Sequence, residues 1–194
     1  MTIADEYLDE NRFALARDAY RNALAEGEGG SHAFANLSTS ENAEAFGFLI
    51  ELITRYPEWV EARLALANAY SAARKLPNAM AQYTILLDKG LSPDEVRRIR
   101  LARYRVAVPA IAITTARDDF MYLWGLARQH ERFRRLRGIL VGRLAELRTS
   151  RGMNVLAAIR DALPEEAELR QFLDAKEHEL KALSALTDGT NSAE

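Results

Sequence analysis

The chain has 194 residues, of which 48% are hydrophobic and 28% charged, as is typical of a single folded domain. It contains no cysteine, which excludes disulfide bonds, a thiolate nucleophile and a zinc–thiolate site. The formal net charge of −2 conceals a segregation, because residues 94–151 hold 14 Lys and Arg against 6 Asp and Glu, whereas both flanks are acidic.

The first ten residues, MTIADEYLDE, are acidic and contain no apolar segment, so we do not expect a signal peptide. No apolar run approaches the roughly 20 residues that a membrane-spanning helix needs. We therefore expect no membrane insertion and a cytoplasmic protein, with the bacterial cytoplasm as the default compartment.

Small and aromatic residues recur at fixed spacings along the first half of the chain. Ala16 and Tyr20 lie 63 residues before Ala79 and Tyr83, and Ala45 lies 34 residues before Ala79. A small residue lets a second helix approach closely, and a residue four positions later lies on the same helix face. The spacings predict antiparallel helix pairs in three units, over residues 2–27, 31–56 and 58–91.

The third unit matches this pattern best. Leu66 and Tyr70 share one helix face, and Pro77 suits the first turn of the next helix, so residues 75–78 are expected to supply the turn. The unit resembles a tetratricopeptide repeat, a helix–turn–helix of about 34 residues. The resemblance implies an all-α fold, an α-solenoid of antiparallel helix pairs closed by C-terminal capping helices.

In the family that the chain resembles, partner peptides lie in a concave groove lined by the leading helix of each unit. Asn68 occupies the place where many such repeats keep an asparagine that binds the peptide backbone. Leu64 replaces the lysine of the variety that grips a C-terminal carboxylate, which argues against such a clamp. Carried onto the third unit, the groove-facing residues are Glu61, Leu64, Ala65, Asn68 and Ser71.

After residue 91 the pattern weakens, although a fourth unit over residues 92–120 is compatible with it. Ser92 and Pro93 predict a helix start, residues 106–109 fall where the turn belongs, and residues 110–115 lack the small–aromatic pair. Thr115 and Asp118 resemble a capping box, which predicts a helix over 116–129. Further helices are expected over 131–148, 154–163 and 164–186.

These later helices, residues 116–187, are either divergent repeats or a separate bundle that caps the solenoid. We expect one domain over residues 1–187 and a frayed tail over 188–194. In the last helix Leu169, Leu173 and Leu180 belong to an apolar stripe, which either covers the solenoid end or pairs with a second copy of the chain.

Signals for catalysis are poor. There is no phosphate-binding glycine loop, and the three histidines are far apart without the spacing of metal ligands. Asp118 and Asp119 point about 100° apart on a helix, so first-turn stabilisation explains them better than acid–base chemistry. We therefore expect no catalytic residues, no metal and no cofactor, and interpret Trp59 and Trp124 as packing residues.

The arginine-rich band allows several interpretations. Arg97, Arg100 and Arg103 lie on one predicted helix, and a second group lies between residues 128 and 137. They either pair with neighbouring acids, attract an acidic protein segment, or bind nucleic acid or another acidic polymer. The sparse lysines and the lack of interleaved aromatics argue against nucleic acid. We expect a non-enzymatic adaptor, scaffold or chaperone-like module that binds a protein or peptide partner.

Overall fold

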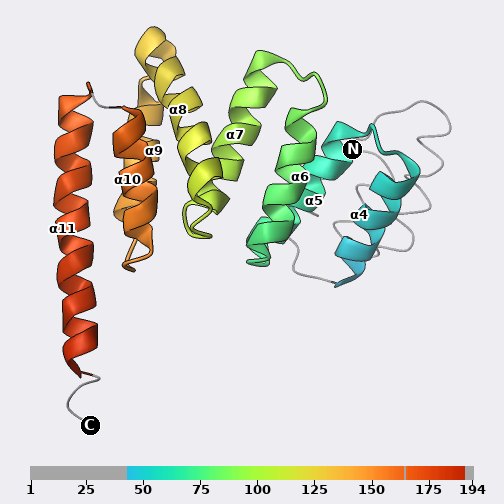
Figure 1. The fold of residues 1–194 in the computed structure, drawn as a ribbon. Coiled ribbons are helices and arrows are strands. Elements are labelled where there is room, and N and C mark those ends of the chain that lie inside the picture. The colour runs from blue at the N-terminus through green and yellow to red at the C-terminus, as the bar shows by residue number, and fades with distance from the viewer. Residues whose placement is uncertain (1–42, 164, 191–194) are drawn as a thin grey trace. The chain divides into compact units, whose positions relative to one another are not determined.

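The computed structural model describes residues 43–163 and 165–190, and every regular element in those residues is helical, without strands (Figure 1). This agrees with the expected all-α class. No helix among these residues has the length and apolarity required to traverse a bilayer. The helices, labelled as in Figure 1, are α4 (Ala43–Arg55), α5 (Val60–Ala72), α6 (Leu76–Leu87), α7 (Pro93–Ala107), α8 (Ile113–Gln129), the 3-10 helix η1 (Glu131–Phe133), α9 (Arg135–Ala145), α10 (Gly152–Ala162) and α11 (Ala167–Thr190).

The chain divides between Ser92 and Pro93 into two compact units. In the first unit, α4 packs on α5, and α5 packs on α6. Phe46 of α4 stacks on Tyr70 of α5 with ring centroids 5.0 Å apart. Leu49 and Leu66 are fully or almost fully buried between these helices. The expected helix over residues 43–55 is confirmed, since its bounds are those of α4.

Helices α5 and α6 form a hairpin whose three-residue connection makes them antiparallel. Ala79 of α6 is completely buried, so the second helix approaches α5 closely there. Arg74 adopts a left-handed backbone with φ of 58°, and the Lys75 amide donates to the Tyr70 carbonyl at 2.9 Å. These features define a Schellman turn, closed by main-chain hydrogen bonds. Pro77 lies in the first turn of α6, as the sequence predicts.

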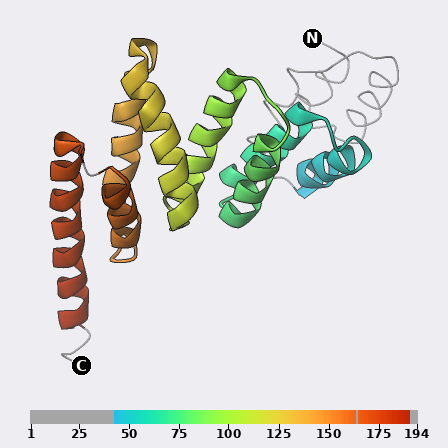
Figure 2. The ribbon, with the colours of Figure 1, turned by 45° about the horizontal axis from the view of Figure 1, so that its top comes forward.

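In the second unit, α7 and α8 form another hairpin, visible as two helices joined at one end (Figure 1 and Figure 2). Tyr104 of α7 and Phe120 of α8 are fully buried, with ring centroids 5.9 Å apart. The turn is again of the Schellman type. Ile111 has φ of 54°, and the Ala112 amide donates to the Ala107 carbonyl at 2.9 Å.

The two hairpins share one internal arrangement, displaced by 37 residues. Ala79 and Ala116 are both completely buried, and Tyr83 corresponds in the same way to Phe120. Arg63 donates from Nη1 to Gln82 Oε1 at 2.9 Å, and 37 residues later Arg100 Nη1 donates to Asp119 Oδ1 at 3.0 Å. The further matched positions, each followed by its counterpart, are Ala62 and Ile99, Ala67 and Tyr104, and Leu86 and Leu123.

This register corrects two expectations. Tyr104 corresponds to Ala67, not to Tyr70, because α7 starts one turn earlier than α5 in the shared register. The small–aromatic pair expected and not found over residues 110–115 lies just beyond them, at Ala116 and Phe120. Tests of the same spacing at Ala16 and at the side chain of Ala45 lie outside the described residues.

Helix α9 lies beside α7 in the same direction. Tyr104 of α7 donates from its hydroxyl to the Leu140 carbonyl of α9 at 2.8 Å, and burial raises the pKa of Tyr104 well above its usual value. Towards the ends of these helices, Arg143 of α9 donates to the Arg105 carbonyl at 2.7 and 3.1 Å. Helix α8 packs against both α9 and α10.

Helix α10 repeats the pattern of α8 after 36 residues. Gly152, Leu156 and Ile159 are buried at the places of Ala116, Phe120 and Leu123. A Cβ on Gly152 would lie 3.2 Å from the side chain of Leu147, so this position admits only the smallest residue without a shift.

The 24-residue helix α11 packs along α10 and buries its apolar stripe there (Figure 2). Leu169, Leu173 and Leu180 are at most 4% exposed. Lys176 interrupts the stripe and is itself buried, with its ammonium 2.7 Å from Glu179. The described part of the stripe is therefore covered by the rest of the second unit over most of its length.

Several predicted boundaries are wrong. Helix α8 begins at Ile113, and its N-cap residue makes no side-chain capping bond, so Thr115 and Asp118 form no capping box. The helix expected over 131–148 is split into η1 and α9 and ends at Ala145. Helix α11 begins at Ala167, three residues after Pro164, which lies outside the described residues.

Candidate interaction surface

The residues predicted to line a groove on α5 form one stripe. Glu61, Leu64, Ala65 and Asn68 follow the i, i+3, i+4, i+7 spacing of a single helix face. Glu61 is exposed and Leu64 and Asn68 are half-buried, as is Ser71 one turn further on, whereas Ala65 is 2% exposed. The structure thus presents four of the five residues to the surface and uses Ala65 for packing.

Asn68 is held in place from within the first unit. The Tyr83 hydroxyl donates to Asn68 Oδ1 at 2.6 Å. That bond occupies the carbonyl end of the amide, and Asn68 Nδ2 has no hydrogen-bond partner among the described residues. The side chain is therefore a positioned donor that could meet a main-chain carbonyl of another chain.

The predicted site arginines Arg100 and Arg103 bind an acid inside the second unit. Arg103 forms a bidentate pair with Asp119, with Nε and Nη2 each 2.8 Å from a carboxylate oxygen, and Arg100 adds a third bond at 3.0 Å. Asp119 is completely buried. Arg100 also lies 4.5 Å above the Tyr122 ring. Both arginines serve to compensate a buried charge.

Asp119 is the residue that sequence reasoning placed wrongly. It was expected to stabilise a first helical turn from the surface, but α8 begins at Ile113, which puts Asp119 in the second turn and on the face toward α7. The signal that could have located it is the 19-residue separation from Arg100, because Arg63 and Gln82 have the same separation.

Arg97, the third predicted site arginine, packs around an aromatic ring. Its guanidinium lies 5.0 Å from the centre of the Phe133 ring, and Arg132 lies 4.5 Å from the same ring. Arg97 Nε is 3.5 Å from the carboxylate of Asp94. Cation–π contacts of this kind contribute about 0.5–1 kcal/mol at exposed sites, so these arginines help to fix η1 against α7.

The rest of the basic band is partly neutralised. Arg128 lies 2.7 Å from Glu166, and Arg134 lies 3.3 Å from Glu131. Arg137 lies over the Trp124 ring at 5.7 Å. In contrast, the exposed side chains of four arginines have no carboxylate or aromatic partner within the described part of the chain. These are Arg98, Arg105, Arg135 and Arg151.

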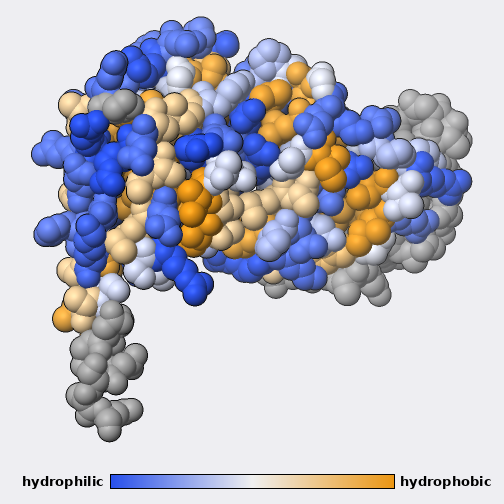
Figure 3. Space-filling model, in the orientation of Figure 1, coloured by the Kyte–Doolittle hydropathy of each residue, from blue (hydrophilic) through white to orange (hydrophobic). Residues whose placement is uncertain are grey.

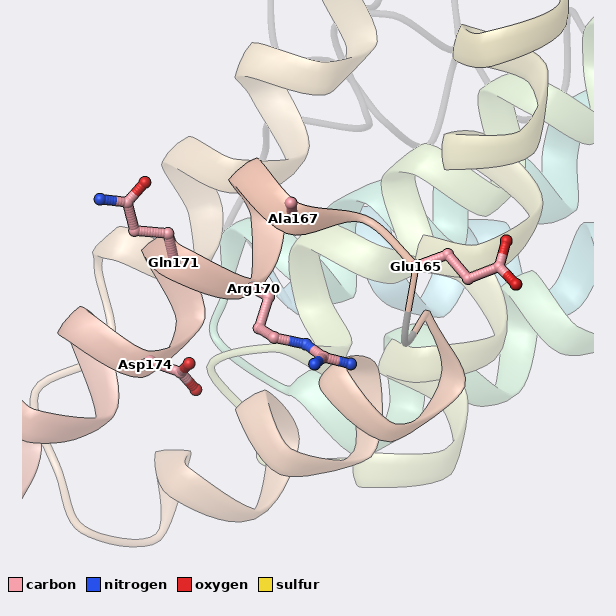
Figure 4. A pocket seen from close by; sticks show the side chains of 5 residues that line it. All are labelled: Glu165, Ala167, Arg170, Gln171 and Asp174. Carbon is pink, nitrogen blue, oxygen red and sulfur yellow. The ribbon is translucent and has the colours of Figure 1, made fainter.

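A shallow charged depression lies between α10 and the start of α11 (Figure 4). Arg160 donates to Asp174 at 3.0 Å and to Glu177 at 2.6 Å, and these bonds raise the pKa of Arg160. Hydrogen bonds from Lys181 and Arg160 lower the pKa of Glu177. Because these charges pair with one another at an open surface, the depression lacks the apolar walls of a small-molecule site.

Groups with catalytic or metal-binding potential do not converge within residues 43–163 and 165–190, where no cluster of three His, Asp or Glu could hold a metal ion. Both tryptophans pack. Trp124 is 6% exposed and stacks on Phe120 at 5.3 Å, and Trp59 meets Tyr56 edge-on at 6.3 Å.

The face shown in Figure 3 is mixed in character. Hydrophilic residues cover most of the outward side of α11, and hydrophobic residues appear toward its C-terminal end (Figure 3). Leu183 and Leu186 in that part of the helix are 37% and 69% exposed. No protein-family model, curated protein or solved structure matches the chain.

Proposed function

We propose that the chain is a non-enzymatic interaction module that binds a partner protein or peptide on the outer faces of its leading helices. In this proposal α5, α7 and α9 are the leading helices of an α-solenoid of the tetratricopeptide type, and α11 is its cap. Such a module serves as an adaptor, scaffold or chaperone-like protein.

The observation that carries the proposal is the 37-residue correspondence of the two hairpins. One side of each leading helix is committed to its partner helix through Ala79 or Ala116. The opposite side is left to other uses, and in α5 it includes Leu64 and Asn68, both half-buried. Repeated helix pairs of this kind characteristically leave one extended face for binding.

The α5 face combines apolar area with a fixed polar group, which is the composition of a peptide-binding surface. Leu64 supplies apolar area, and Asn68 supplies a donor whose orientation is set by Tyr83. A donor held by a neighbouring side chain loses less conformational freedom on binding than a free one. An extended peptide could satisfy this donor with a main-chain carbonyl while placing an apolar side chain against Leu64.

Selection from a random peptide display library tests the proposal. We expect the full chain to enrich peptides that bind with micromolar affinity or better, and the variant Leu64→Glu to lose at least tenfold of that affinity. Ile85→Glu is the matched control, because Ile85 is 39% exposed on the trailing helix α6. Failure to enrich any peptide, or equal losses in both variants, would reject the proposed binding face.

A further inference from the structure

We infer that Arg98, Arg105 and Arg135 form a binding row for an acidic peptide segment, in which carboxylates pair with the three guanidinium groups. The inference rests on the proposed function and names the partner's chemistry. It also assigns partner binding to arginines other than the Arg97, Arg100 and Arg103 that the sequence suggested.

Arg98 and Arg105 lie on the side of α7 that faces away from α8. Seven residues separate them, so they share one helix face, about 10 Å apart along the axis. The side toward α8 holds Arg100 and Arg103, both bound to Asp119. In the register shared by the two hairpins, Arg98 and Arg105 correspond to Glu61 and Asn68 of the α5 stripe.

Arg135 continues the row on the neighbouring helix. Leu136, Leu140 and Leu144 are the buried positions of α9 and lie 37 residues after Ile99, Arg103 and Ala107 of α7. The hydrogen bond from Tyr104 to Leu140 fixes this parallel neighbourhood. Arg135 therefore stands level with Arg98.

Local stability does not account for Arg135. It is the first residue of α9, whose first turn contains no acidic residue. A cation at this end of a helix faces the positive end of the helix dipole, which is unfavourable. An external carboxylate would remove that conflict. Nearby acids in the described residues are already engaged, Glu131 with Arg134 and Glu146 with Arg143.

The residues between the arginines specify a peptide rather than a nucleic acid. Leu101 and Ala102 of α7 are half-buried, and Ile139 of α9 is 39% exposed. The row thus alternates guanidinium groups with aliphatic surface and includes no aromatic ring on which a base could stack. Two acidic residues three positions apart in an extended peptide are about 10 Å apart, the separation of Arg98 and Arg105 along α7.

The test uses the same peptide selection followed by binding titrations of the full chain. The triple variant Arg98→Gln, Arg105→Gln, Arg135→Gln is compared with the triple variant Arg117→Gln, Arg128→Gln, Arg134→Gln. The control removes the same net charge from arginines that already pair with Asp118, Glu166 and Glu131. Circular dichroism of both variants verifies that they remain folded.

We expect enriched peptides to be acidic and to bind the first variant about tenfold more weakly than the wild type, in line with three surface ion pairs. The control variant should change affinity less than threefold, and raising the salt concentration should weaken the wild type most. Enriched peptides that are neutral, or that bind both triple variants equally, would overturn the inference while leaving the proposed function intact.

A single-stranded oligothymidylate provides the competing outcome. We expect no saturable binding of this probe at 150 mM salt. If the oligonucleotide binds tightly, displaces the acidic peptides and is lost only in the first triple variant, the row is a nucleic-acid surface and the peptide inference fails. If no peptide is enriched and no oligonucleotide binds, the proposed function itself fails.

Discussion

The hairpins α5–α6 and α7–α8 have the same geometry and different buried chemistry. At one matched pair of positions, Arg63 meets the neutral amide of Gln82, whereas Arg100 meets the carboxylate of Asp119. The second hairpin also carries Arg103 where the first has Leu66, and Arg103 binds the same carboxylate. The first hairpin thus packs a leucine where the second completes an ionic network.

The difference shows that helix crossings of the repeat constrain size more strongly than polarity. The alanines at Ala79 and Ala116 are identical because any larger side chain would separate the helices. The polar pair beside them can be neutral or ionic, provided that each buried group has a partner. Consequently the two hairpins should respond alike to changes in size and differently to changes in charge.

The largest expected effect is that of Asp119→Ala, which leaves two arginines without their anion. We expect a loss of about 3–5 kcal/mol in the free energy of unfolding of the second unit. The matched change Gln82→Ala should cost about 1 kcal/mol, because a neutral acceptor is lost. The chain has two tryptophans, so urea titrations of Trp59→Phe and Trp124→Phe backgrounds report on one unit each. Equal losses in the two hairpins would contradict the distinction.

A smaller effect is expected where the hairpins are alike. Ala79→Leu and Ala116→Leu should each cost about 1–3 kcal/mol by overpacking a closed helix crossing. Ala81→Leu on the exposed side of α6 is the control and should change the stability by less than about 0.5 kcal/mol. The same single-tryptophan urea titrations measure all three. A tolerated leucine at Ala116 alone would break the correspondence of the two crossings.

The smallest effect is expected from giving the first hairpin the charge of the second. Gln82→Glu places a carboxylate beside Arg63 and should stabilise the first unit by up to about 1 kcal/mol. Arg63 would lower the pKa of that carboxyl below about 4.3, its value in the unfolded chain. The gain should therefore be present above pH 4.3 and disappear as the pH falls through the lowered pKa. A gain that persists at pH 2 would indicate another cause.

The sequence was sufficient to predict the helical class and the helix pairs of residues 43–91, because proline positions and small–aromatic spacings are local signals. It was insufficient after residue 92, where α7 gained a turn in front of Ile99 and shifted every later spacing by three residues. A fixed period of 34 therefore paired Tyr104 with Tyr70, although its burial matches that of Ala67.

The candidate site was less predictable than the fold. Five arginines of α7 are indistinguishable by type, and only the position of Asp119 decides which of them are engaged. Asp119 in turn reads as a surface residue, since adjacent Asp118 is exposed and pairs with Arg117. Distinguishing bound from unbound arginines needs the register of α7 against α8, which is a tertiary property.

Ile111 has a consequence for the order in which the second hairpin forms. A β-branched residue resists the left-handed backbone that Ile111 adopts, and glycine or asparagine would be favoured there. The turn therefore cannot direct its helices together; it is held in shape by contacts such as that of Tyr104 with Phe120. We expect α7 and α8 to dock first during folding and the connection at Ile111 to close last.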